Sequence, residues 1–450
     1  MRVLMLSWEY PPETVGGIAP HVHDLALALS GKGQEVTVLT RSKDPKGTTE
    51  QREGVRICRM GRSAPEPPDF VSWVMQLNLQ LMEKAVSLVE EGEAFDLIHA
   101  HDWLVAYAGK ALKHAFRLPL IATIHATEWG RNNGLHNELQ RYISNVEWWL
   151  AYEAWRVICC SRYMCGELQR IFQVPANKMR VIPNGVYPEL FRPPAGDARA
   201  IRRQYAADDE QVVFYVGRLV FEKGLDLLLE AARKVLAHRE KVKFIIAGKG
   251  PHAGHLHHRA RQTGLYHKFY FTGYVDDLTR NALFSTADVA VFPSLYEPFG
   301  IVALEAMAAG TPVVVADTGG LGEVVQHGKN GLKAFPNNPE SLADNILWVL
   351  THPEEAAALR DQARRDLETE YNWGKIAEQT IDLYREVQSE YQRSDWHRQV
   401  AGAARALARD RRIRPGAATA GATGAGRYTP AQTATGWPPP AFNGQKEGYQ

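Results

Sequence analysis

Two glutamates stand eight positions apart where a loop is expected to pass into a helix. Pro298 favours an extended conformation at the residue before it, so Glu297 belongs to the loop. Glu305 falls on an early turn of the helix, which is expected to begin near Gly300. The first amides of this helix would lack intrahelical acceptors and carry the positive end of its dipole; they belong to Phe299, Gly300 and Ile301. Acceptors and free donors together suit a polyhydroxylated ligand, because each buried hydroxyl must both donate and accept.

A pair of glycines follows the first apolar run of the chain. Gly16 and Gly17 stand just before a helical segment that begins near Ala19. Glycines at the start of a helix let backbone amides approach a phosphate group, so both are candidate phosphate-binding residues. A plain glycine turn is the alternative.

Cations follow a later apolar run, the expected strand Val212 to Val216. Arg218 and Lys223 lie beyond its carboxyl end, where they could hold a diphosphate. The alternative is a solvated loop in which Glu222 pairs with Lys223. Further backbone amides are expected at the ends of two other strands, at Gly248, Gly250, Thr318, Gly319 and Gly320.

Histidines raise two questions. His125 ends an expected strand and could bond a sugar hydroxyl, or it could be a satisfied core histidine. His99, His101 and Asp102 resemble a metal cluster, but no further ligand follows at a fixed spacing, and we expect no metal there. A second group also resembles a metal cluster, and we expect no metal there for the same reason. It comprises His252, His255, His257 and His258.

Short apolar runs alternate with segments of helical periodicity in two successive series, which indicates two parallel sheets. The expected strands are Val3 to Leu6, Val36 to Leu39, Leu97 to Ala100, Leu120 to His125, Val212 to Val216, Val242 to Ala247, Lys268 to Thr272, Val289 to Pro293 and Pro312 to Ala316. We therefore predict an α/β fold of two tandem doubly wound, Rossmann-like domains facing a crevice. The predicted parts are residues 1–186, 187–370, a helix crossing back to the first domain (371–398) and a disordered tail (399–450).

Composition limits the partners and the location. The 450 residues carry a formal net charge of +1, which gives no basic field for nucleic acid. The four cysteines form no CxxC pair, and the apolar start of the chain is soon interrupted by Glu9 and two prolines, so a cytoplasmic protein is expected. No run approaches the roughly 20 apolar residues that span a bilayer, so any membrane contact is expected to be peripheral.

Taken together, these motifs resemble those of the retaining nucleotide-sugar glycosyltransferases of family 4, which have the two-domain GT-B fold. The resemblance covers about residues 1–392 and is carried by Gly16-Gly17, His125, Arg218 with Lys223, and Glu297 with Glu305. The stretch His99-Ala100-His101-Asp102-Trp103 is similar to the HAHDW stretch of bacterial and archaeal glycogen and starch synthases. Those synthases usually have a lysine before the glycine pair, where this chain has Thr14, so one donor-phosphate contact is missing or replaced.

The resemblance implies a role for each matching residue. Arg218 and Lys223 would neutralise the leaving diphosphate without a metal or cofactor. Glu305 would bind the nucleotide ribose. Glu297 and the neighbouring amides would hold the donor sugar, with His125 beside its reacting carbon. His101 and Asp102 would lie on the acceptor side.

Three functions remain open at this stage. The first is hexosyl transfer, of glucose above all, from ADP-glucose or UDP-glucose to an α-glucan. The second is transfer by a family 4 enzyme to a lipid, a small metabolite or a surface polysaccharide. The third is a non-catalytic glycan-binding protein on a GT-B frame. The oligomeric state is not indicated by the sequence.

Overall fold

The computed structural model describes residues 1–61, 66–191 and 195–398. Residues 1–398 form one compact unit that contains two separate β-sheets. The tail predicted for residues 399–450 lies outside the described residues. The finer domain boundaries expected after residues 186 and 370 stay predictions.

The first sheet has eight strands in the order β3-β4-β2-β1-β5-β6-β7-β8. All neighbouring pairs are parallel except β3 with β4. The central strands β1, β5 and β6 are buried except at Arg2, which explains why they read as nearly continuous apolar runs. The strands are β1 (Arg2–Leu6), β2 (Glu35–Arg41), β3 (Thr48–Arg52), β4 (Val55–Met60), β5 (Leu97–His101), β6 (Leu120–Ile124), β7 (Arg156–Cys159) and β8 (Met179–Val181).

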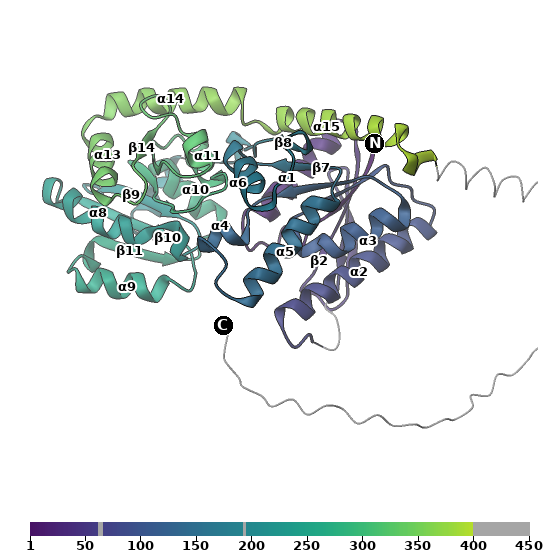
Figure 1. The fold of residues 1–450 in the computed structure, drawn as a ribbon. Helices are drawn as coiled ribbons and strands as arrows, with labels where there is room; N and C mark the ends of the chain where they lie inside the picture. Colours follow the sequence, from purple (N-terminus) through teal and green to yellow (C-terminus); the bar gives the residue numbers. More distant parts are fainter. Residues whose placement is uncertain (62–65, 192–194, 399–450) are drawn as a thin grey trace, which may run out of the picture. The chain divides into compact units, whose positions relative to one another are not determined.

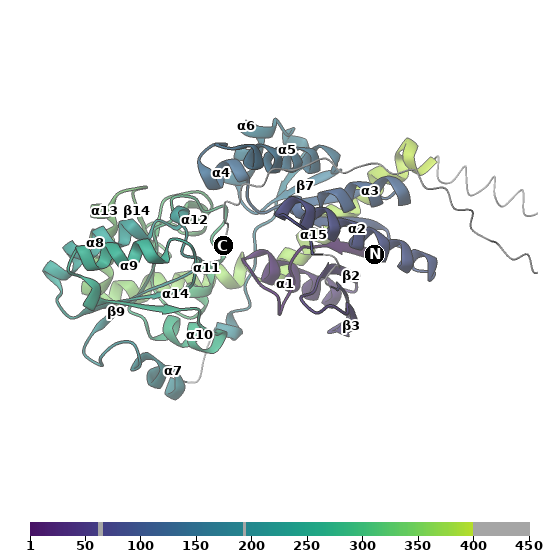
Figure 2. The ribbon, with the colours of Figure 1, turned by 90° about the horizontal axis from the view of Figure 1, so that it is seen from below.

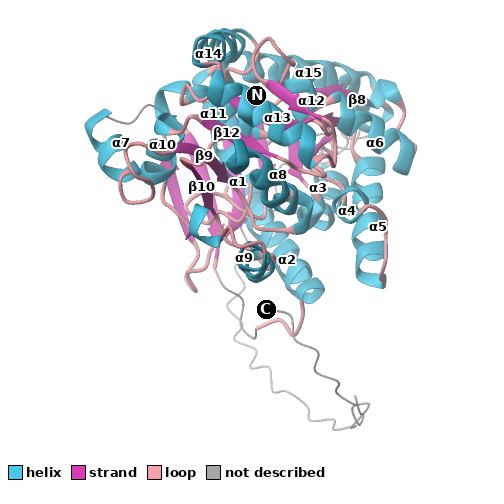
Figure 3. Ribbon diagram, turned by 90° about the vertical axis from the view of Figure 1, so that its left-hand side faces the viewer, coloured by secondary structure: helices cyan, strands magenta, loops and turns pink. Residues whose placement is uncertain are grey.

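The second sheet has six parallel strands in the order β11-β10-β9-β12-β13-β14. Figure 3 shows these strands in magenta with helices packed around them. Their bounds are β9 (Gln211–Val216), β10 (Val242–Ala247), β11 (Phe269–Gly273), β12 (Val289–Phe292), β13 (Val313–Ala316) and β14 (Leu332–Ala334). Both sheets have the doubly wound order that the alternation of strands and helices predicts.

The helices of the first half are α1 (Ile18–Gly31), α2 (Phe70–Glu90), α3 (Ala106–Phe116), α4 (Glu128–Asn132), α5 (Glu138–Glu153) and α6 (Arg162–Phe172). Those of the second half are α7 (Ala195–Arg202), α8 (Leu225–His238), α9 (Ala253–Gln262), α10 (Asp277–Thr286), α11 (Ile301–Ala308), α12 (Leu321–Val324), α13 (Pro339–Thr351) and α14 (Pro353–Thr369). Several begin at a side chain that accepts a hydrogen bond from the first turn, such as Asp69 before α2 and Ser161 before α6.

The last helix, α15 (Trp373–Arg393), packs on the first half (Figures 1 and 2). Its buried face shares one apolar cluster with α1 and the central strands. The Tyr384 hydroxyl lies 2.7 Å from Nδ1 of His99 on β5, and Trp155 Nε1 donates to Glu390 over 2.8 Å. This helix therefore ties the end of the described chain to its first sheet.

Every strand expected from the sequence is present, with bounds that shift by one or two residues. The expected strand that ended at His125 ends at Ile124, so His125 opens the loop after β6. Five strands were not expected: β3, β4, β7, β8 and β14. Strand β3 carries the exposed polar sequence TTEQR, in which no buried face could be recognised.

Candidate functional site

The predicted site residues follow strands at the points where the strand order reverses. In the second sheet the chain moves outward from β9 to β11 and then returns to β12 on the other side of β9. Arg218 and Lys223 follow β9, and Glu297 follows β12. In the first sheet, Gly16 and Gly17 follow β1, and His101 ends its neighbour β5. Open α/β sheets bind ligands at such positions, beyond the carboxyl ends of the strands.

Lys223 and Glu297 form an ion pair. Nζ of Lys223 lies 2.6 Å from Oε2 of Glu297, which also accepts from the Ser294 hydroxyl at 3.1 Å. Glu297 is 8% exposed, so its pairing with a cation is a strong local interaction. The main chain holds the pair together, because the Glu222 carbonyl accepts from the amides of Leu295 at 2.8 Å and Tyr296 at 3.2 Å.

Arg218 is the exposed cation of the same loop. Its guanidinium lies 3.4 Å from Glu222, so Glu222 pairs with Arg218 and leaves Lys223 to Glu297. The solvated-loop alternative, in which Glu222 pairs with Lys223, is therefore wrong. Gly248 and Gly250 support this loop by close backbone packing, since a Cβ on either would overlap the carbonyl oxygen of Gly217 or Leu219. The Gly248 amide donates to the Gly273 carbonyl at 2.7 Å and so is not free for a ligand here.

The loop of Thr318, Gly319 and Gly320 supports Glu297 from the other side. Gly319 has φ +56°, and a Cβ there would overlap the Glu297 carbonyl oxygen. The Gly320 amide donates to that same oxygen at 2.8 Å, and the Thr318 amide donates to Ala316. Two of the three predicted phosphate-binding amides are thus engaged in the structure, and the loop positions the backbone of Glu297.

The start of α11 has the free donors that its sequence predicts. Gly300 precedes the helix with φ 100°, a conformation that favours glycine. In the described chain, the amides of Phe299, Gly300 and Ile301 have no protein acceptor. Glu305 is partly buried on the same helix, and burial raises the pKa of its carboxyl group, with Arg280 opposing the shift. Its role toward a ribose stays a prediction.

The amide of Gly16 is already bound to a carboxylate. Glu9 is fully buried, and its two oxygens accept from Val15 at 2.5 Å, Gly16 at 3.2 Å and Ala19 at 3.3 Å. Burial raises the pKa of Glu9, while these amides and Arg41 oppose the shift. Glu9 therefore fixes the glycine loop. This role could not be recognised from the sequence. The amide of Gly17 has no acceptor within the described residues.

His125, His101 and Asp102 lie together at the ends of β5 and β6. Nδ1 of His101 is 3.3 Å from Nε2 of His125, and Asp102 Oδ1 accepts from the His125 amide at 2.7 Å. Asp102 has φ 62°, an unusual conformation for a residue with a side chain. Burial raises the pKa of Asp102 to about 6, against the opposing charge of Arg131. Burial, followed by the charge of Arg131, lowers the pKa of His125 to about 3.

Asp102 is 2% exposed and His101 is fully buried, whereas His125 is partly exposed. In the structure the Asp102 carboxylate accepts from the backbone amide of His125, and its role on the acceptor side stays a prediction. His125 is therefore the member of this group that a ligand can reach directly.

Hydrogen bonds join the His125 loop to the Glu297 loop. The Thr127 amide donates to the Tyr296 hydroxyl at 3.2 Å, and that hydroxyl donates to Glu167 at 2.8 Å. Ser161 donates to the Pro298 carbonyl at 2.6 Å. These connecting residues were not singled out in the sequence, since their roles depend on contacts between segments more than 100 residues apart.

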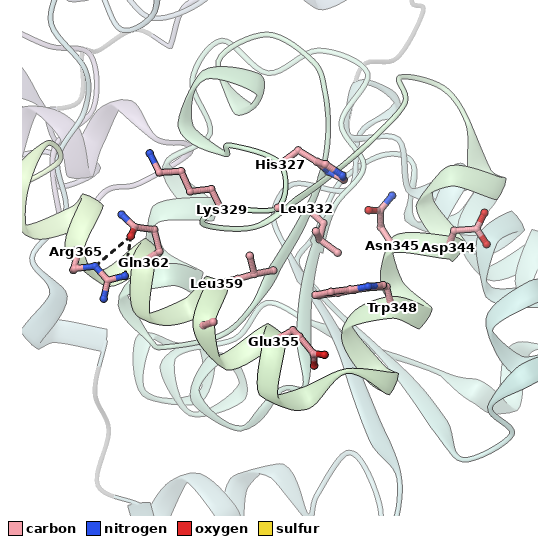
Figure 4. Close-up of a pocket in the computed structure, with 12 residues that line it drawn as sticks. His327, Lys329, Leu332, Asp344, Asn345, Trp348, Glu355, Leu359, Gln362 and Arg365 are labelled. Carbon is pink, nitrogen blue, oxygen red and sulfur yellow. Dashed lines mark hydrogen bonds between the residues drawn. The ribbon is translucent and has the colours of Figure 1, made fainter.

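A separate cavity of about 760 Å³ lies between α13, α14 and the segment around β14 (Figure 4). Its sides include Trp348, Leu359 and Arg365, and none of the predicted site residues is among the described residues that line it. The volume suits a small molecule, and the described lining includes the ionisable side chains of His327, Lys329 and Glu355. Among the helices in the described parts of the chain, none combines the length and apolar character needed to cross a bilayer.

Comparison with known proteins decides the family. The description Glycosyltransferase Family 4 matches residues 15–190, and Glycosyl transferases group 1 matches residues 197–366. An uncharacterized glycosyltransferase of Methanocaldococcus jannaschii is 39% identical over 389 residues, which cover 86% of this chain and 98% of that protein. This chain is a family 4 glycosyltransferase.

Two further proteins are similar to this family 4 transferase over most of its length. The glycogen synthase of Mycobacterium tuberculosis is 36% identical over 400 residues, which cover 85% of this chain and 94% of that protein. The structure of sucrose-phosphate synthase from Thermosynechococcus elongatus superposes with a TM-score of 0.74 at 27% identity, over 86% of this chain and 99% of that one. The family 4 transferase has the GT-B fold, as its motifs predicted.

Proposed function

We propose that this family 4 transferase moves a glucosyl group from a nucleotide-sugar to the end of an α-glucan, with retention of the anomeric configuration. The observation that carries the proposal is the Lys223–Glu297 pair beside the free amides that begin α11. A nucleotide-sugar presents a diphosphate to a cation and several sugar hydroxyls to carboxylates and amides. ADP-glucose and UDP-glucose are the candidate donors.

In this proposal the cations act on the leaving group. Arg218 and Lys223 stabilise the negative charge that develops on the diphosphate as the glycosidic bond breaks. Because they supply the positive charge, the proposal assigns no catalytic metal or cofactor. The amide of Gly17 adds a donor from the first half of the chain.

The sugar is held by residues of both halves. Glu297 and the amides of Phe299, Gly300 and Ile301 bind its hydroxyls, and His125 bonds the hydroxyl beside the reacting carbon. Glu305 binds the nucleotide ribose. The acceptor hydroxyl attacks from the face that the diphosphate leaves, and the departing phosphate takes its proton.

The acceptor is proposed from the relatives and from one motif. The glycogen synthase at 36% identity and the stretch from His99 to Trp103 favour an α-glucan. The similar sucrose-phosphate synthase favours a small metabolite as the acceptor, which belongs to the second candidate class. A lipid or a surface polysaccharide remains an alternative acceptor, and a non-catalytic glycan-binding role is the alternative of another class.

The test is a transfer assay with each donor and a maltodextrin primer, followed by ¹H NMR of the product. The proposal predicts a longer primer with new α-linked residues. Donor consumption that occurs only with a small phosphorylated acceptor would replace the α-glucan with that class. Failure of every donor with every acceptor, by a folded enzyme, would favour the non-catalytic reading.

A further inference from the structure

Three histidine rings meet at the edge of the proposed sugar site. His21 comes from α1, His101 from the end of β5 and His125 from the loop after β6. One ring nitrogen of each lies within 4.8 Å of the other two. The ring centres are 4.6 Å apart for His21 and His125, 5.5 Å for His21 and His101, and 5.6 Å for His101 and His125.

The protein leaves several nitrogens of this cluster without a partner. His21 is 5% exposed, and among the described residues its ring nitrogens have no close hydrogen-bond partner other than the buried side chain of Asn184. Nε2 of His101 is buried and has no partner among the described residues. Buried polar atoms are nearly always paired in folded proteins, so ring nitrogens that remain without a partner are candidate ligand atoms.

The spacing of the rings fits a metal ion. Two nitrogens bound to one tetrahedral Zn²⁺ at about 2.0–2.1 Å stand about 3.3 Å apart. Nδ1 of His101 and Nε2 of His125 are 3.3 Å apart. A direct hydrogen bond between the two rings would have this length too, but it would not involve His21.

We propose that His21, His101 and His125 bind a divalent transition-metal ion, with Zn²⁺ as the best fit. Three imidazoles are a known ligand set for zinc, and they leave a fourth position open. Because His125 is the partly exposed member, the open position faces the sugar site. We further infer, on the basis of the proposed function, that the bound ion keeps the transferase inactive because it occupies His125.

The charges around the cluster do not oppose a cation. The positive Arg131 acts on His125, but Asp102, Glu147 and Glu128 surround that guanidinium and raise its pKa. The Asp102 carboxylate is bound to the backbone of His125 itself. Asp102, the first of the acidic groups to raise the pKa of Arg131 against burial, therefore offsets part of its charge beside the site.

A second group of possible ligands provides a control. His252 and His255 each lie within hydrogen-bond distance of Asp226, at 2.6 Å and 3.0 Å, and Arg259 donates to the same carboxylate at 3.0 Å. The carboxylate is thus already paired with a cation, and we propose no metal there. His255→Ala removes a histidine without touching the first cluster.

The test is a titration of the metal-free full chain with Co²⁺, followed by visible absorption. We expect one Co²⁺ per chain in the wild type and in His255→Ala, with the strong bands of a four-coordinate ion that excess Zn²⁺ removes. His21→Ala should bind the ion at least about 100-fold more weakly, because loss of a supporting outer contact alone costs 10–100-fold. If His21→Ala does not fold, the variant His21→Asn takes its place in the titration. A second measurement is the Tm of the wild type, which Zn²⁺ should raise.

Three results would overturn the site. The first is the absence of a cobalt spectrum in the wild type, which would mean that water fills the cluster. The others are an unchanged spectrum in the His21 variants and the loss of the spectrum in His255→Ala. The inhibitory role has its own measurement, since Zn²⁺ should stop glucosyl transfer and a chelator should restore it. If the ion binds but does not inhibit transfer, the inhibitory role is wrong and the metal site remains. A chain that binds Co²⁺ but transfers no sugar overturns the proposed function and keeps the site.

Discussion

At the scale of single residues, the site depends on charges that are paired before any ligand arrives. Lys223 holds Glu297, and Glu9 holds the amides of the glycine loop. The carboxylate of Glu9 occupies the amide of Gly16, which was expected to meet a phosphate. The sequence identified which residue types could bind a nucleotide-sugar, but it could not show that some of these groups satisfy one another.

Replacing Lys223 with methionine should separate stability from donor binding. The variant Lys223→Met keeps a long, unbranched side chain but removes its charge. The Glu297 carboxylate, which is 8% exposed, is then left without its cation. We expect the free energy of unfolding to fall by at most about 3 kcal/mol, the low end for a buried pair, because the lysine side chain is partly exposed. Transfer should fall about 100-fold or more.

The double variant Lys223→Met with Glu297→Gln is the control for that change. Denaturant unfolding should show most of the lost stability restored, since no unpaired carboxylate remains. Transfer should stay low. Recovery of transfer in the double variant would show that the two side chains serve the fold alone.

At the scale of elements, the loops that hold Glu297 rely on glycines with little space around them. Gly319→Ala adds a Cβ against the Glu297 carbonyl at φ +56°, whereas Gly328→Ala adds one at φ +72° with no atom within 4 Å. Both should lose about 1–2 kcal/mol from the left-handed conformation. Only Gly319→Ala should also weaken transfer, and equal transfer by both variants would contradict the positioning role of this loop.

The contact between α15 and β5 gives a second prediction at this scale. Tyr384→Phe removes the hydroxyl 2.7 Å from His99 and leaves a buried ring nitrogen unpaired, so thermal unfolding should show a loss of about 1–3 kcal/mol. Tyr391→Phe on the same helix is the matched control, because in the described chain its hydroxyl forms no hydrogen bond. A similar loss in both variants would mean that helix packing alone matters.

The elements also show what could be predicted from the sequence. The strands that carry Arg218, Glu297 and His125 were recognised because buried parallel strands are continuous apolar runs. Strand β3 was missed because its exposed side chains carry no such pattern. His21 was missed for another reason: it lies on the buried face of α1 and becomes notable only beside His101 and His125, which come from other elements.

At the scale of the whole molecule, the two halves meet through bonds near the site. The carboxylate of Glu323 in the second half accepts from the amides of Arg162 at 3.0 Å and Tyr163 at 2.7 Å, where α6 begins in the first half. Such a contact can open when the halves move apart about a hinge. The structure thus contains a contact that can bias the separation of the halves.

Glu323→Ala should therefore enlarge the chain when no donor is present. We expect small-angle scattering to show a greater radius of gyration than in the wild type, and a saturating nucleotide-sugar to return it to the wild-type value. Glu340→Ala, which removes an exposed ion pair with Lys234 inside the second half, should change neither value. Identical scattering by all three proteins would show that the Glu323 contact does not bias closure.

We propose that Lys223 and Glu297 form the donor site of a nucleotide-sugar transferase. Calorimetric titration of the metal-free chain with ADP-glucose and UDP-glucose tests it most directly. We expect at least one of them to bind the wild type, and Lys223→Met, checked to be folded, to bind it at least about tenfold more weakly through loss of a charge-assisted contact. Equal binding by both proteins, or no binding of either donor, would contradict it.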